Sequence, residues 1–244
     1  MKVRFVGTGD AFAGGGRFQT CILLESEKRR VLMDCGASSL IALRRLDIPF
    51  NSIDAVLLTH LHGDHFAGVP FLILDAQLAS KRDTPLTVAG PPGTRQRLTD
   101  LSEALYPGMT GKVPEFPLDV IEMNPGRTNP LPGLSVTPFE VSHSSGTLST
   151  GLRVEMDGRV VVYSGDTAWT DALIPAAAGA DLFIVECYFH QKEVPGHQNH
   201  RTLSAHLGKI DAKRIILTHM GEEMLTHVDE IPEECAYDGL VVEV

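Results

Sequence analysis

The chain has 244 residues, 43% of them hydrophobic, which is enough material for one large hydrophobic core. Its net charge of −10 and its lack of a dense Lys/Arg run argue against nucleic acid as a partner, because phosphate contacts supply most non-specific affinity. No apolar stretch reaches the roughly 20 residues that a membrane-spanning helix needs, and a strand pattern starts at Val3 without a signal-peptide pattern before it. We therefore expect a cytoplasmic protein with no membrane partner.

Short apolar strands alternate with turns and amphipathic segments along the chain. The hydrophobic pattern predicts strands at residues 2–7, 20–25, 29–34, 54–59, 86–89, 118–123, 133–141, 148–156, 159–164, 181–186, 213–218 and 239–243. It predicts helices at 38–46, 66–80, 94–105, 168–177, 202–208 and 221–227. Many strands with few helices, and no repeat or flexible linker, indicate one domain over residues 1–244 with two sheets and helices outside them.

Neither the glycines nor the cysteines predict a separate cofactor motif. Gly7 and Gly9 follow the first strand as in a dinucleotide-binding loop, but no convincing helix opens after them. A tight loop is the better interpretation, and loops at strand ends often border functional sites. The four cysteines are widely spaced with no C-x-x-C pair, so we expect them to be reduced and mostly buried.

Three histidines and an aspartate gather within six residues directly after the apolar run 55–58. The segment reads His60-Leu61-His62-Gly63-Asp64-His65. Neutral imidazoles and carboxylates are good ligands for zinc and similar ions, and a turn after a strand can spread close-spaced ligands around one point. The alternative is a solvated, histidine-rich turn. We favour a metal site.

This segment resembles the signature of the metallo-β-lactamase superfamily. Residues 6–9 and 32–36 resemble early motifs of its ribonuclease Z and phosphodiesterase branches. Three later segments arrive in the order that the family uses, at 141–143, 163–167 and 217–219. The resemblance spans nearly the whole chain. It implies an α/β (α+β) fold, a four-layer αββα sandwich with its metals at one sheet edge.

Carried over residue by residue, the resemblance implies two divalent metal ions. The implied ligands are His60, His62 and His143 for one ion, Asp64, His65 and His219 for the other, and Asp166 as a bridge between them. Taken singly, His143, Asp166 and His219 have ordinary explanations, as a residue of a polar loop, a helix cap and a strand cap respectively. Their joint appearance at strand ends favours ligands. Zn fits this set, and Mn or Fe would also accept it.

The implied ion pair indicates hydrolysis. Two ions about 3.5 to 4 Å apart can share a hydroxide and polarise the substrate. Asp64 and Asp166 would orient this metal-bridging hydroxide, so Asp64 is also a predicted catalytic residue. His62 resembles the hydrolytic branches, because diiron oxygen-reducing relatives usually place a glutamate at that position.

The segment 197–202 resembles the additional histidine motif of ribonuclease Z and related phosphodiesterases, through His200 and Thr202. The strand around Glu186 resembles the one whose glutamate orients that histidine. A carboxylate at one imidazole nitrogen favours imidazolium, so His200 is predicted to stabilise the phosphorus transition state or to protonate the leaving oxygen, with Glu186 behind it. Alternatively, His200 only opens a helix and Glu186 is an incidental buried acid. The remaining histidines are expected at the surface or behind the ligands: His190, His197, His206 and His227.

The sequence departs from ribonuclease Z in the segment that binds the substrate. Ribonuclease Z usually recognises tRNA with a protruding basic, glycine-rich arm between the third ligand histidine and the bridging aspartate. Here only residues 144–165 separate them, filled by two strands joined at Asp157-Gly158, so we do not expect tRNA as the substrate. A small phosphodiester, such as a cyclic nucleotide or a cyclic sugar phosphate, is predicted instead. Side chains that could contact it, or could equally serve packing or the surface, are Phe66, Trp169, Tyr188, Arg17 and Arg201.

Three classes of function remain open. The first is a dinuclear phosphodiesterase, which includes ribonuclease Z-like RNA processing without the arm. The second is hydrolysis of a carboxylic ester, thioester or lactone, against which the predicted pair of His200 and Glu186 argues. The third is a metal-bound scaffold or ligand sensor, against which the intact ligand set argues. Relatives often form dimers through helices near the site, so the resemblance also implies a homodimer.

Overall fold

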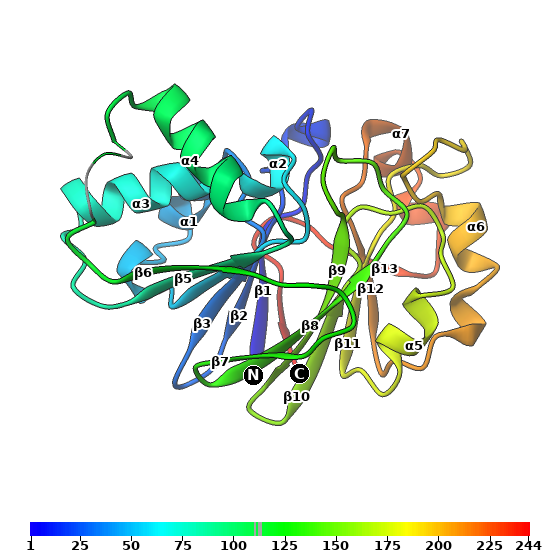
Figure 1. The fold of residues 1–244 in the computed structure, drawn as a ribbon. Coiled ribbons are helices and arrows are strands. Elements are labelled where there is room, and N and C mark those ends of the chain that lie inside the picture. Colours follow the sequence, from blue (N-terminus) through cyan, green and yellow to red (C-terminus); the bar gives the residue numbers. More distant parts are fainter. Residues whose placement is uncertain (110, 112–113) are drawn as a thin grey trace.

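The computed structural model describes residues 1–109, 111 and 114–244, which form two facing sheets (Figure 1). In spatial order the first sheet contains β14 (Val241–Glu243), β1 (Lys2–Gly7), β2 (Cys21–Glu25), β3 (Arg30–Met33), β4 (Ala55–Leu57), β5 (Leu86–Gly90) and β6 (Leu118–Glu122). The second contains β13 (Glu234–Cys235), β12 (Ile215–Thr218), β11 (Leu182–Glu186), β10 (Arg159–Tyr163), β9 (Thr150–Met156), β8 (Leu134–Glu140) and β7 (Asn129–Leu131).

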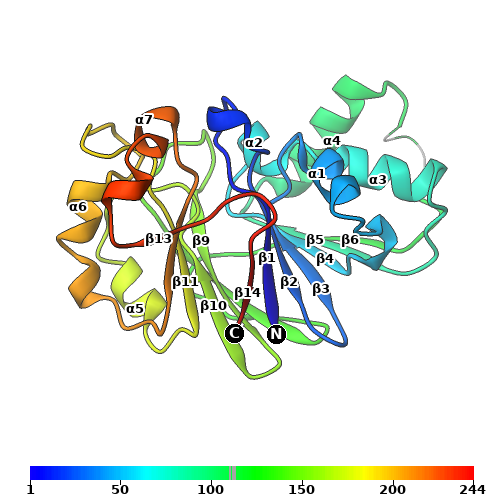
Figure 2. The ribbon, with the colours of Figure 1, turned by 180° about the vertical axis from the view of Figure 1, so that it is seen from behind.

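Helices cover the outer face of each sheet, as the view from behind also shows (Figure 2). Outside the first sheet lie α1 (Ser39–Arg45), α3 (Val69–Leu78) and α4 (Thr94–Leu105). Outside the second lie α5 (Leu173–Ala177), α6 (His200–Ser204) and α7 (Glu222–Leu225). The predicted four-layer αββα sandwich is confirmed. Among the described residues, no helix has the length and apolar character needed to cross a membrane.

The apolar strands are buried on both faces because each sheet is sandwiched. In β4, Leu57 belongs to the core between the two sheets, whereas its neighbour Val56 packs under the helices of the first sheet. In β10, Tyr163 faces the core between the sheets and Val162 faces the helices of the second sheet. Successive side chains point to opposite faces, so a strand covered on both sides reads as a continuous apolar run.

The predicted strands are present, and the differences lie at the edges and in the helices. The short strands β7 and β13 were not predicted, because their sequences, Asn-Pro-Leu and Glu-Cys, contain no apolar run. The helix predicted at 66–80 is two helices, α2 (Gly63–Phe66) and α3. Gly68 separates them in close contact with the chain at Gly36, whose carbonyl oxygen would lie 2.4 Å from a Cβ added to Gly68.

The C-terminal ends of five strands lie at the same edge of the sandwich. Strands β3, β4 and β5 are parallel to one another, and so are β10, β11 and β12. Strand β8 runs in the same direction as β10 because β9 is antiparallel to both. The segments that follow β4, β8, β10, β11 and β12 therefore meet at this edge, which is the upper edge in Figure 1.

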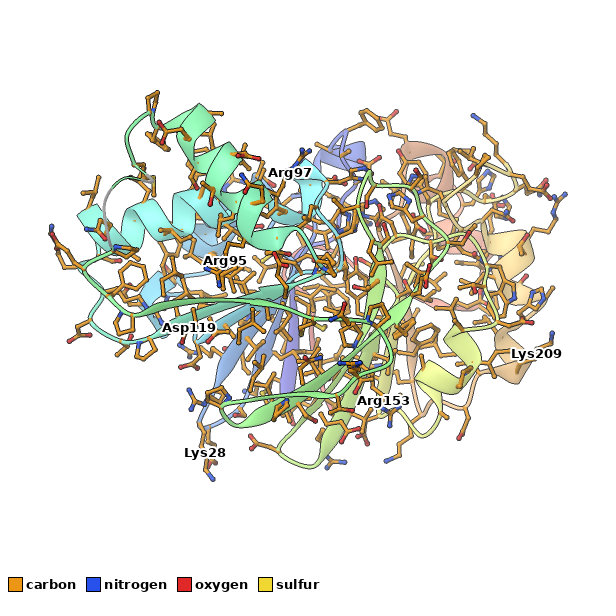
Figure 3. The ribbon with its side chains drawn as sticks, in the orientation of Figure 1. Lys28, Arg95, Arg97, Asp119, Arg153 and Lys209 are labelled. Carbon is orange, nitrogen blue, oxygen red and sulfur yellow. The ribbon has the colours of Figure 1, made fainter. Side chains whose placement is uncertain are left out.

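The segment between His143 and Asp166 contains β9 and β10, joined by a tight turn as predicted. Asp157 (φ 50°) and Gly158 (φ 73°) both adopt the left-handed conformation that two-residue hairpin turns require. No arm protrudes from residues 144–165. Of the basic side chains labelled in Figure 3, Lys28, Arg97 and Lys209 lie on separate parts of the molecule.

Candidate metal centre

The histidine-rich turn after β4 is fixed by close backbone contacts. His65 is buried, and its carbonyl oxygen accepts a hydrogen bond from the Cys35 amide at 2.7 Å. A Cβ added to Gly36 would lie only 2.2 Å from the carbonyl oxygen of Asp64, so only glycine allows this approach. The turn therefore packs directly against the loop after β3, with α2 starting at Gly63.

The structure brings the seven predicted metal ligands into two groups that share one residue. In each group, one donor atom per residue lies within 4.8 Å of all the others; the groups are His60, His62, His143 and Asp166, and Asp64, His65, Asp166 and His219. Asp166 Oδ1 lies 3.1 Å from His65 Nε2, and Asp166 Oδ2 lies 3.4 Å from His219 Nε2 and 3.9 Å from His60 Nε2. Asp166 therefore has the position that a bridging carboxylate needs.

The donor set fits divalent metal ions. His60 Nε2, His65 Nε2 and Asp166 Oδ1 are buried and make no hydrogen bond with the described residues. A buried polar atom without a partner costs about 1–3 kcal/mol. Imidazole nitrogens and carboxylate oxygens are ligands for Zn and similar ions, so an ion at the centre of each group would satisfy these atoms.

Most of the histidines in the two groups are held through Nδ1, which leaves Nε2 available. The pairs are His60 with Thr59 Oγ1 at 3.1 Å, His65 with Asp34 Oδ2 at 2.7 Å, His143 with the Gly196 carbonyl oxygen at 2.8 Å, and His219 with Thr20 Oγ1 at 3.0 Å. Metal-ligating histidines are commonly oriented in this way. His62 differs, because its Nδ1 lies 3.2 Å from His143 Nε2.

Asp34 holds the turn from behind and was not identified as a site residue from the sequence. Its carboxylate is fully buried, contacts His65, and accepts hydrogen bonds from the amide and hydroxyl of Thr59, both at 2.8 Å. Its backbone is left-handed (φ 60°), as is that of His219 (φ 54°). Strained backbone of this kind is concentrated at functional sites. The strain depends on tertiary contacts, so no sequence pattern indicates it.

The acids of the cluster stabilise positive charge. Burial lowers the pKa of His65, but Asp166, Asp64 and Asp34 together raise this pKa well above its usual value. Conversely, burial raises the pKa of Asp166, and the surrounding histidines, led by His219, bring it well below its usual value. The site therefore stabilises positive charge, which divalent metal ions would supply.

The predicted pairing of Glu186 with His200 is wrong. Glu186 is fully buried at the end of β11, and its Oε1 lies 2.5 Å from Nδ1 of His197. His200 instead bonds Glu233 through Nε2 at 2.8 Å. The side chain of Asn199 caps α6 by accepting a hydrogen bond from the amide of Thr202, so His200 is the first helical residue and faces the C-terminal segment.

His197 takes the position predicted for His200. Its ring centre lies 5.0 Å from that of His143, and its ring is parallel to that of His219 (6°) at 6.4 Å. Burial lowers the pKa of His197, but the Glu186 carboxylate outweighs this effect and raises it. A sequence signal was available, because Asn199 three residues before Thr202 is a typical helix cap and places His197 in the preceding loop.

Of the side chains predicted to contact substrate, Tyr188 is the one beside the site. Its ring centre lies 4.9 Å from that of His197, and its hydroxyl donates to Asp10 at 2.7 Å. Phe66 is buried in the core and is not available to substrate. The others are engaged elsewhere: Trp169 stacks on His206, Arg17 bonds the carbonyl oxygen of Ala236, and Arg201 bonds Glu193.

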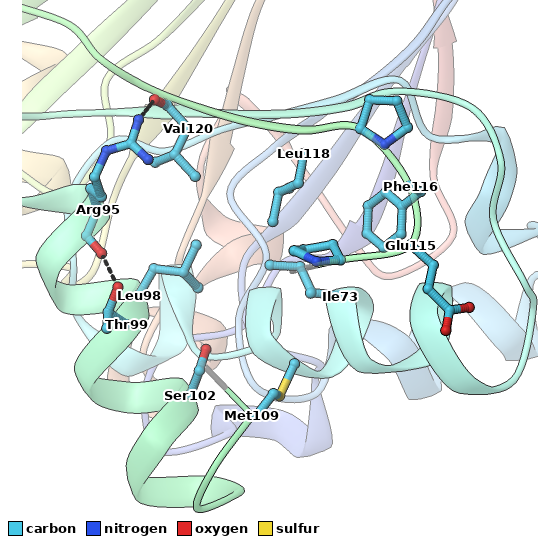
Figure 4. A pocket seen from close by; sticks show the side chains of 12 residues that line it. Ile73, Arg95, Leu98, Thr99, Ser102, Met109, Glu115, Phe116, Leu118 and Val120 are labelled. Carbon is cyan, nitrogen blue, oxygen red and sulfur yellow. Dashed lines mark hydrogen bonds between the residues drawn. The ribbon is translucent and has the colours of Figure 1, made fainter. Parts of the chain in front are cut away.

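A mainly apolar pocket of about 650 Å³ lies apart from this centre, between α3, α4 and β6 (Figure 4). Its lining includes Ile73, Leu98 and Phe116, and Arg95 bonds the carbonyl oxygen of Val120 at its rim. No predicted ligand or catalytic residue is among the side chains that line it. The pocket is therefore lined by other residues than those of the metal centre.

Residues 1–235 match the family described as anti-Pycsar protein Apyc1. Ribonuclease Z of Haloferax volcanii is 26% identical over 295 aligned positions, which cover 98% of this chain and 91% of that protein. The solved structure of the short form of human tRNase Z superposes with a TM-score of 0.81 at 24% identity, over 100% of this chain and 99% of that one. The structure of YhfI of Bacillus subtilis, a metallo-β-lactamase fold protein, superposes with a TM-score of 0.78 at 23% identity, over 99% of both chains. The chain therefore belongs to the anti-Pycsar protein Apyc1 family, and it is a metal-dependent, ribonuclease Z-like hydrolase of the metallo-β-lactamase superfamily.

Proposed function

We propose that this hydrolase is a phosphodiesterase that acts on a small phosphodiester, with cyclic nucleotides and cyclic sugar phosphates as the first candidates. The observation that carries the proposal is the pair of His197 and Glu186 beside the two donor groups. Hydrolysis of a phosphodiester needs a nucleophile, stabilisation of charge on the phosphoryl oxygens, and a proton for the leaving oxygen. The pair can supply the second and third of these.

The two donor groups hold the ions in this proposal, and Zn is the proposed metal. The ions would supply a nucleophile at neutral pH and polarise the phosphoryl group. Asp64 and Asp166 carry the negative charge that balances the two cations. The Nδ1 partners of the histidines fix the rings in advance, so little reorganisation is needed when substrate binds.

His197 is the proposed general acid. Its Nδ1 contacts the carboxylate of Glu186, which raises its pKa and favours the protonated ring. Nε2 then carries the proton for the leaving oxygen or stabilises a phosphoryl oxygen. Glu186 also accepts hydrogen bonds from the amides of Thr167 and Gln198, at 2.7 and 3.2 Å, so the carboxylate that positions His197 is itself fixed.

Two features support a small substrate over tRNA. The segment between His143 and Asp166 is a simple hairpin, and the net charge of −10 disfavours a long polyanion.

The loop after β1 supports a nucleotide as the substrate. Asp10 organises this loop by accepting hydrogen bonds from the amides of Phe12 and Gly14, and it also binds Tyr188. Phe12 is 84% exposed, so its ring is free to stack on a base.

The proposal is tested by a substrate panel with Zn-loaded protein. The panel contains bis(p-nitrophenyl) phosphate, purine and pyrimidine cyclic nucleotides, a precursor tRNA, a lactone and a thioester. We expect turnover of the diester and of at least one cyclic nucleotide, lost on chelation and restored by Zn²⁺. Turnover of the lactone or thioester alone, or of the tRNA alone, would overturn the proposal.

A further inference from the structure

A second group of metal-ligand side chains lies outside the site described above. His190 follows β11, Glu223 belongs to α7, and His227 follows α7. One donor atom from each lies within 4.8 Å of the other two. The two histidines are half-buried and the glutamate is exposed, so the group is open to solvent. None of its members belongs to the two groups that share Asp166.

The geometry of the group leaves donor atoms free. The rings of His190 and His227 are stacked, with centres 4.1 Å apart and planes at 29°. Glu223 Oε2 accepts a hydrogen bond from the His190 amide at 2.7 Å, which holds α7 against the segment after β11. His227 Nδ1 lies 2.9 Å from Glu230 Oε2, so Nε2 remains available. A carboxylate on one imidazole nitrogen is the arrangement that orients histidine ligands towards metals.

The local charge favours a cation. The segment 222–234 contains no Lys or Arg, and its acids are Glu222, Glu223, Asp229, Glu230, Glu233 and Glu234, of which Glu234 is paired with Arg214. Two imidazoles at this distance repel each other if both are protonated, whereas two neutral imidazoles can share an ion. His200, which is bound to Glu233, lies 5.6 Å from His190 by ring centres and extends the nitrogen-rich surface.

We propose that His190, Glu223 and His227 bind an additional divalent transition-metal ion, separate from the dinuclear centre. Two imidazoles and one carboxylate suit Zn²⁺, Ni²⁺ or Cu²⁺ better than Mg²⁺ or Ca²⁺, which prefer oxygen ligands. The ion would cross-link the segment after β11 to α7. Since β11 ends at Glu186 and α7 begins three residues after His219, it would stiffen two segments that carry residues of the main site. This proposal does not depend on the proposed function.

The first test counts bound Zn²⁺ at equilibrium by dialysis and elemental analysis. We expect wild type to bind about one equivalent more than His227→Asn or His190→Asn, because loss of one of three ligands removes a solvent-open site. Glu222→Gln is the matched control, since it lies on the same helix outside the group, and it should bind as wild type does. Equal Zn²⁺ counts in all four proteins would overturn the proposal.

A second test uses Cu²⁺ as a probe and does not require catalytic activity. Protein whose main site is already loaded with Zn²⁺ receives one equivalent of Cu²⁺, and electron paramagnetic resonance reports its ligands. We expect nitrogen hyperfine structure in wild type and in Glu222→Gln, and its loss in the double variant His190→Asn/His227→Asn. The same spectrum in the folded double variant would contradict the site. Circular dichroism establishes that each variant is folded.

Discussion

The two sheets contribute to the metal centre in different ways. On the side of the first sheet, four predicted ligands come from one turn, held from behind by Asp34. On the side of the second sheet, each contributor lies at or just after the end of a different strand: His143, Asp166, Glu186 and His219. The local backbone of the turn therefore positions the ligands on the first side. The pairing of parallel strands, such as Val185 with Leu217, positions the residues on the second side. A substitution on the first side should act locally, and one at Asp166 should act on the whole centre.

Asp166→Ala is expected to have the largest effect, because Asp166 belongs to both donor groups. The metal bound at these two groups should fall from about two equivalents towards zero, and diesterase activity should fall by roughly a thousandfold or more. His62→Ala is the comparison on the first side, and it should retain the ion of the other group. Elemental analysis with the diester assay measures both variants. A normal metal count in Asp166→Ala would remove its bridging role.

Glu186→Gln should lower activity and move its pH profile while the metal content stays unchanged. If His197 acts in its protonated form, activity falls as pH rises through its pKa. Glu186 raises this pKa, so its removal should shift the alkaline limb to lower pH and reduce kcat by roughly 10- to 100-fold. The measurement is kcat/KM against pH. An alkaline limb that does not move would mean that Glu186 does not act through His197.

Asp34→Asn probes the local side. Asparagine tolerates the left-handed backbone of this position, so the turn should persist while the charge behind His65 is lost. Affinity for the ion of the His65 group should fall by roughly 10- to 100-fold, the usual effect of removing a partner of a ligand. Titration against a competing chelator measures this affinity. An affinity equal to that of wild type would show that the turn holds its ligands without Asp34.

Thr20→Val is the matched test on the other side and should have the smallest effect. It removes the hydrogen bond between Thr20 Oγ1 and His219 Nδ1 at 3.0 Å and the longer one from Thr20 Oγ1 to the Gly9 carbonyl oxygen at 3.4 Å, and it preserves the shape of the side chain. Because strand pairing still fixes His219, metal affinity should fall by about tenfold or less. The same chelator titration measures it. A loss of metal affinity as large as that in Asp34→Asn would mean that the ligands on both sides of the centre depend equally on their hydrogen-bond partners.

This difference also explains what could be predicted from the sequence. The αββα layers and most strands are evident from the sequence because strands buried on both faces read as apolar runs. The turn 60–65 indicates a metal site because its four predicted ligands lie within six consecutive residues. His143, Asp166 and His219 were identified through the resemblance to the superfamily, whose motifs follow the same order along the chain. The choice between His197 and His200 failed because it depends on where the loop after β11 turns into α6. The role of Asp34 was missed because it exists only in the packed turn.

The central claim is that His197, paired with Glu186, delivers the proton at the dinuclear centre. The most direct test compares His197→Ala with His200→Ala in one assay of metal content and diester hydrolysis. His197→Ala should retain its metal and lose roughly 100- to 10,000-fold in kcat. His200→Ala, three residues away and bound to Glu233, should remain close to wild type in both. Full activity in His197→Ala, or loss of turnover only in His200→Ala, would contradict the account.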